Sequence, residues 1–174
     1  MNPSLYEPLG HTLAPLFEAL PFNQAMSRLV VADIDSEHTH LVEKLINDAD
    51  LHNRPELCAG LWLYIDQLDR SHTISQQIES PTGSFWHAIM HRREGDFSNS
   101  KYWYRRIGKH PAMGHIDIPG GSAAAGTSIG NYDPFHFVDR VESAHRKGRD
   151  HNPELVALQR REWKRLFEWC AEHH

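Results

Sequence analysis

The sequence predicts an all-α fold, an irregular bundle or orthogonal array of about seven to eight helices in a single domain covering residues 1–174. Three prolines follow polar residues, as is typical of the first turn of a helix: Pro55, Pro134 and Pro153. Three glycines stand where a left-handed residue would end a helix: Gly95, Gly108 and Gly148. The connections between these segments are short, which favours antiparallel neighbours.

These signals and apolar residues at helical spacing predict eight helices. They cover residues 11–20, 36–48, 55–68, 70–79, 83–94, 98–107, 134–147 and 153–172. The second has an inward face of Leu41, Val42, Leu45 and Ile46. The third begins at Pro55 and holds the longest apolar run, 57–65. The last has an apolar face of Leu155, Leu158, Trp163, Leu166, Phe167, Trp169 and Cys170, of which we expect Trp163 and Phe167 to be buried.

Residues 109–133 form a long segment rich in glycine and proline, which excludes a continuous helix there. Any strand is confined to 114–120, where Ile116, Asp117 and Ile118 alternate. Loops of this length are often lids or binding loops, but a passive connection draped over the helices explains the pattern equally well.

The formal net charge of −5 and the pI near 6.2 argue against a nucleic-acid-binding protein, which usually carries a basic face. The run 57–65 is about half the length that a membrane span requires, so we expect no membrane insertion. No secretory signal opens the chain, and Cys58 and Cys170 lack a C-x-x-C spacing. Together these features predict a cytoplasmic protein with two reduced thiols; a homo-oligomer is compatible with them.

Histidines in the region 69–106 suggest a metal site. His87 and His91 are four residues apart and project from one face of a helix, and Glu94 follows within one turn. These three side chains, with His72 as a further ligand, are suited to Zn²⁺ or another divalent metal. The H-E-x-x-H zinc motif is absent. The alternative is that these histidines are hydrogen-bonded or exposed without a metal.

The same region predicts a site for a small polar or anionic ligand. Arg92, Arg93 and Arg105 would hold an anion by bidentate hydrogen bonds. His72, His87 and His91 would hydrogen-bond the ligand, and Trp86 or Tyr102 would form a wall. In the alternative interpretation, the arginines pair with nearby carboxylates or are solvated.

The segment 84–111 is similar to a single tetratricopeptide repeat. The residues that carry this likeness are Gly95, Asp96, Phe97, Ser100, Tyr104, Ile107 and Pro111. The proline comes one residue early, and His87 and His91 stand where the repeat usually has apolar or aromatic residues. The resemblance implies a helical hairpin and little about peptide binding.

Residues Asp69–His72 and Phe85–Asn99 also resemble a group of bacterial and fungal proteins without an assigned activity, so this resemblance implies no reaction. Three functional hypotheses therefore remain. The first is a module that binds a small polar or anionic molecule in the hairpin 69–106. The second is an enzyme, a hydrolase or lyase, that uses His87, His91 and Glu94 as general base or metal ligands. The third is a structural or protein-interaction module.

Overall fold

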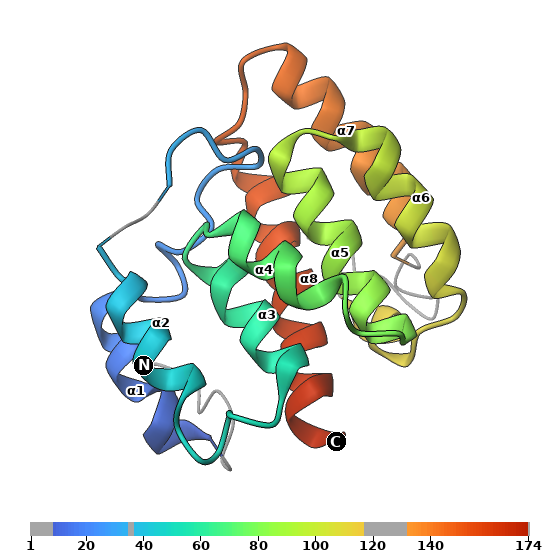
Figure 1. Ribbon diagram of the computed structural model, residues 1–174. Helices are drawn as coiled ribbons and strands as arrows, with labels where there is room; N and C mark the ends of the chain where they lie inside the picture. The colour runs from blue at the N-terminus through green and yellow to red at the C-terminus, as the bar shows by residue number, and fades with distance from the viewer. Residues whose placement is uncertain (1–8, 35–36, 117–131, 174) are drawn as a thin grey trace, which may run out of the picture.

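Helices make up the regular secondary structure of the described residues, which are 9–34, 37–116 and 132–173 of this computed structural model (Figure 1). They are α1 (Gly10–Ala19), α2 (Thr39–Ile46), α3 (Pro55–Tyr64), α4 (Leu68–Ser75), α5 (Pro81–Glu94), α6 (Phe97–Ile107), the 3₁₀-helix η1 (Pro111–His115), α7 (Pro134–Arg146) and α8 (Pro153–Glu172). The predicted all-α fold is confirmed.

Several helix ends follow the signals in the sequence. Pro55, Pro134 and Pro153 each occupy the first turn of a helix, and Asp133 and Asn152 cap α7 and α8 through their side chains. Gly95 ends α5 with a φ of 89° in the left-handed region, which L-residues with a side chain rarely adopt.

Two predicted helix ends are wrong by four residues each. The third helix ends at Tyr64 rather than at residue 68, because Asp66 adopts a left-handed φ of 60° and interrupts the helical backbone before α4. The fourth ends at Ser75 rather than at residue 79. Ser80 then caps α5 by accepting a hydrogen bond from the Gly83 amide at 3.1 Å.

Helix α5 lies at the centre of the molecule (Figure 1). It packs against α4 on one side and α6 on the other, and it also contacts α3 and α8. Every residue from Phe85 to Arg93 is buried. A helix surrounded in this way is normally apolar on all sides, so its buried histidines and arginines need partners from the neighbouring helices.

The aromatic core lies between α3, α5 and α8. Trp86 and Trp163 are fully buried with ring centroids 6.3 Å apart, and Phe167 stacks on Trp163 at 4.7 Å. Gly60 of α3 permits this packing, since a Cβ there would lie 2.9 Å from atoms of both Trp86 and Phe167. The predicted burial of Trp163 and Phe167 is confirmed.

The glycine- and proline-rich segment begins with η1, so residues 114 and 115 are helical rather than a strand. Residues 117–131 lie outside the described part of the chain, and with them most of the predicted strand and loop. Among the helices that the structure describes, none combines the length and apolar character needed to cross a membrane.

Candidate metal centre

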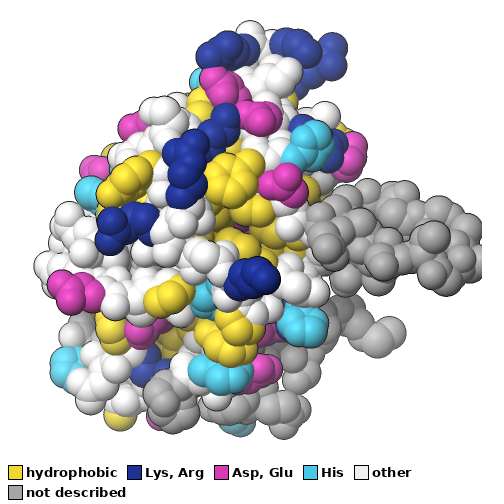
Figure 2. Space-filling view, turned by 90° about the vertical axis from the view of Figure 1, so that its right-hand side faces the viewer, with side chains coloured by type: hydrophobic (Ala, Val, Ile, Leu, Met, Phe, Trp, Pro, Cys, Tyr) yellow, Lys and Arg dark blue, Asp and Glu magenta, His cyan; other side chains and the backbone are white. Residues whose placement is uncertain are grey.

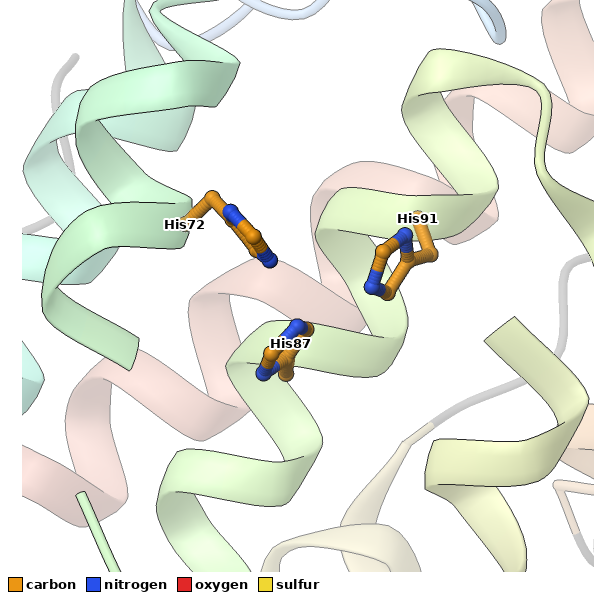
Figure 3. A group of neighbouring side chains, drawn as sticks. All are labelled: His72, His87 and His91. Atoms are coloured by element: carbon orange, nitrogen blue, oxygen red, sulfur yellow. The ribbon is translucent and has the colours of Figure 1, made fainter. Parts of the chain in front are cut away.

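Three histidines from two packed helices converge. His72 lies on α4, and His87 and His91 lie one turn apart on α5 (Figure 3). Each histidine contributes one ring nitrogen, and these three nitrogens all lie within 4.8 Å of one another. His87 and His91 are 3% and 7% exposed, and His72 is half-buried. The tertiary structure therefore joins His72 to the pair that helical spacing predicted.

The three imidazole rings contact one another directly. His87 and His91 are stacked with centroids 4.7 Å apart, as their spacing on α5 requires. The edge of His72 approaches His87 at 4.6 Å and His91 at 5.5 Å. Figure 3 shows His72 reaching across from α4 toward the two rings on α5.

His87 is held between the other histidines and α6. The indole of Trp103 stacks on its ring with centroids 4.0 Å apart. Its Nδ1 is buried and has no hydrogen-bond partner among the described residues. Burial, together with the neighbouring His91 and His72, lowers the pKa of His87 to about 3. The ring is therefore neutral at physiological pH and keeps a lone pair for a ligand.

His91 is oriented by two polar neighbours. Its Nδ1 lies 2.5 Å from Oε1 of Glu94, and the amide nitrogen of Asn99 lies 3.1 Å from its Nε2. A carboxylate can only accept, so in the neutral ring Nδ1 carries the proton and Nε2 has the lone pair. Nε2 is thus the nitrogen of His91 that is suited to hold a metal.

Glu94 lies behind His91 and is not a member of the three-histidine cluster. The sequence interpretation counted this carboxylate as a third metal ligand beside His87 and His91, and the structure brings His72 to that place instead. Glu94, Asp96 and His91 form a second group of close ligand atoms. Both carboxylates in it are exposed, and such surface groups are common without an ion.

Arg92 and Arg93 face the core rather than the histidines. Arg92 is fully buried and forms an ion pair with Glu162 of α8 at 2.5 Å. Its guanidinium also donates a hydrogen bond to the Tyr104 hydroxyl at 2.8 Å. Arg93 donates to Asp66 at 2.7 Å and to the Leu63 carbonyl at 2.9 Å. Buried guanidinium groups require such partners. Both arginines therefore form ion pairs in the core and do not face the histidine cluster.

The remaining predicted ligand residues also lie apart from the histidines. Trp86 packs in the aromatic core, and Tyr102 is 47% exposed on α6. Arg105 extends over Phe135 of α7 with its guanidinium 5.8 Å from the ring centroid. Figure 2 shows the side of the molecule on which α6 lies in Figure 1, and basic side chains lie beside hydrophobic ones there. Of the predicted ligand-binding set, the structure brings together His72, His87 and His91.

Asn99 and Trp103 contact the cluster and were not among the predicted site residues. A signal for both exists in the sequence. The helices α5 and α6 form a hairpin about Gly95, so residues at equal distances from this glycine face each other. His91 and Asn99 stand four residues before and after Gly95, and His87 and Trp103 stand eight before and after it.

Comparison of the chain with protein-family models, with curated proteins and with solved structures gives no match. The likeness of 84–111 to a tetratricopeptide repeat, and that of 69–99 to a bacterial and fungal group, therefore stay predictions.

Proposed function

We propose that this protein binds a divalent transition-metal ion, with zinc as the leading candidate, through His72, His87 and His91. The observation that carries the proposal is the convergence of their ring nitrogens within 4.8 Å. Neutral imidazole suits zinc, copper, nickel and iron, and it is the commonest metal ligand in proteins.

The spacing of the nitrogens is close to what a metal requires. With zinc–nitrogen bonds of about 2.0–2.1 Å in a tetrahedral site, neighbouring ligand nitrogens lie roughly 3.3 Å apart. Nitrogens within 4.8 Å of one another would need to close by at most about 1.5 Å. Side-chain rotations of His72, which is half-buried on the neighbouring helix, can supply much of this movement.

A metal site would also account for a buried polar atom of the cluster that has no hydrogen-bond partner in the described structure. The buried Nδ1 of His87 lacks a hydrogen-bond partner among described residues, and an unpaired buried polar atom is unfavourable. Three imidazoles in contact repel one another when protonated, so the cluster favours neutral rings. A cation held by three lone pairs would stabilise this arrangement.

Glu94 supports this proposal as an outer partner of the metal ligand His91. Histidine ligands usually donate their second ring N–H to a carboxylate, which fixes the tautomer and the ring orientation. The Nδ1–Oε1 contact of 2.5 Å has this form. Asn99 would have to turn its amide away from Nε2 when the metal binds.

Three protein ligands would leave a coordination position open to water. Structural zinc sites normally have four protein ligands, whereas catalytic sites have three and a water. This difference favours, as a second candidate, a metal-dependent enzyme of the hydrolase or lyase type. In it the ion would lower the pKa of the bound water.

The test is metal analysis of protein purified without a tag or a nickel column, followed by titration with Zn²⁺ and Co²⁺. We expect about one ion per chain and a Co²⁺ absorption spectrum typical of nitrogen ligands in a four-coordinate site. The variants His72→Gln, His87→Gln and His91→Gln should each lose this stoichiometric binding. His136→Gln, which changes an exposed histidine of α7, should retain it.

Two results would refute the proposal. One is wild-type protein that retains no ion after dialysis from excess zinc. The other is equal zinc affinity in the wild type and in all three cluster variants, which would locate binding at other histidines.

A further inference from the structure

A polar groove lies between the α4–α5 connection and α6, beside the Trp103 ring that stacks on His87. Its volume is about 560 Å³. The residues that line it are Gln76, Ile78, Glu79, Ser80, Pro81, Ser84, Trp103 and Arg106. This space is large enough for a small organic molecule, since ligand pockets usually measure about 300–1,000 Å³.

The groove continues the face that carries the histidines. Gln76 follows His72 by four residues at the end of α4, and Ser84 precedes His87 by one turn on α5. Trp103 lines the groove and also stacks on His87 at 4.0 Å. A molecule in the groove would therefore lie next to the cluster.

Arg106 provides the groove with a cation that has no carboxylate partner among the described residues. Its guanidinium lies 5.3 Å from the centroid of Trp103 and donates to the Tyr102 hydroxyl at 3.2 Å. Arg92 and Arg93, in contrast, are both paired with carboxylates in the core. A guanidinium held against aromatic rings with N–H donors to spare is suited to a carboxylate or phosphate group.

The other polar residues of the groove favour a ligand with further hydrogen-bonding groups. Glu79 is exposed at the groove without an ion-pair partner in the described part of the chain, and its carboxylate can accept from hydroxyl or ammonium groups. Gln76 and Ser84 offer both donors and acceptors. A hydrophobic anion or a neutral apolar molecule would displace water from these groups without replacing its hydrogen bonds.

We infer that this groove binds a small organic acid that also carries hydroxyl or amino groups, with Arg106 holding the acid group and Glu79 the hydroxyl or amino groups. Trp103 forms the wall between the ligand and His87. The inference goes beyond the proposed metal site and does not require an ion, because every contact that it uses comes from the groove itself.

The test follows the indole N–H signal of Trp103 by NMR in protein as purified, with the signal assigned through Trp103→Phe. The probes are gluconate and glutamate, with glucose and acetate as comparisons that lack the acid group or the additional polar groups. We expect saturable shifts with gluconate or glutamate, weaker binding of acetate and no shift with glucose.

Two arginine variants on the same helix make the test specific. Arg106→Gln should weaken the binding of the acids at least about tenfold, the order expected for loss of a charge-assisted contact. Arg105→Gln should bind as the wild type does, because Arg105 extends over Phe135 and does not line the groove. Both residues are exposed, so neither change threatens the fold.

The inference is overturned if neither gluconate nor glutamate shifts the signal, if glucose shifts it equally, or if Arg106→Gln binds as the wild type does. Acetate binding as tightly as the larger acids would overturn the role of Glu79. These results are separate from the metal content of the same samples, so the failure of one proposal can be told from the failure of the other.

Discussion

The buried position of His87 predicts that metal-free protein loses stability as the pH falls. Burial and the nearby rings of His91 and His72 lower the pKa of His87 to about 3, against an ordinary value of 6.5. Below pH 6.5 the unfolded chain therefore binds a proton that the folded chain excludes. The contribution of the neutral His87 ring to the free energy of unfolding is fully present above pH 6.5 and is lost progressively as the pH falls toward 3.

The magnitude follows from the size of the pKa difference. Each pH unit below 6.5 costs about 1.4 kcal/mol while the folded ring stays neutral. Between pH 6.5 and pH 5 the loss from His87 is therefore at most about 2 kcal/mol. His110, whose pKa is lowered to about 4 by burial and by His173, contributes in the same direction.

Urea denaturation of metal-free protein at pH 5, 6, 7 and 8 measures this loss. His87→Gln should reduce the difference in unfolding free energy between pH 7 and pH 5 by about 1–2 kcal/mol, whatever its effect on stability at pH 7. His136→Gln should leave the difference unchanged, because His136 is exposed. Identical pH dependence in the wild type and His87→Gln would show that His87 titrates normally, and the buried cluster would then be refuted.

Three further changes test the site and the core. Glu94→Gln should weaken zinc binding about 10–100-fold, as loss of an outer carboxylate partner does, while the far-ultraviolet circular dichroism stays unchanged. Unaltered zinc affinity would show that Glu94 does not support the metal ligand His91. Phe167→Ala should lower the free energy of unfolding by about 3–5 kcal/mol through a cavity beside Trp163, and a loss below about 1 kcal/mol would contradict the packing. Glu162→Ala should cost about 3–5 kcal/mol in the same denaturation assay by leaving Arg92 buried without its counter-charge, and near-wild-type stability would mean that the pair is solvated.

Much of the fold was predictable because helix ends depend on neighbours in the chain. Proline after a polar residue places the first turn of three helices, and Gly95 ends α5 where only a residue without a side chain adopts the left-handed conformation easily. The end of α3 was missed because Asp66, unlike glycine, gives no strong local signal for its positive φ. The carboxylate of Asp66 accepts a hydrogen bond from Arg93, which lies on α5.

Part of the candidate site is equally local. Helical spacing aligns His87 with His91, and the hairpin about Gly95 sets Asn99 and Trp103 opposite them. The first relation predicted the histidine pair, whereas Asn99 and Trp103 were not predicted, although both relations can be counted along the chain.

The remaining assignments were decided by the tertiary structure. Because α5 is buried on every side, it has no solvent-facing stripe to show which of its polar residues meets which neighbour. His87 and His91 face α4 and α6, where His72 joins them, whereas Arg92 faces α8 and finds Glu162, 70 residues away in sequence. Local chemistry determines where each helix begins and ends, but the partner of a buried charge depends on which distant helix packs against it.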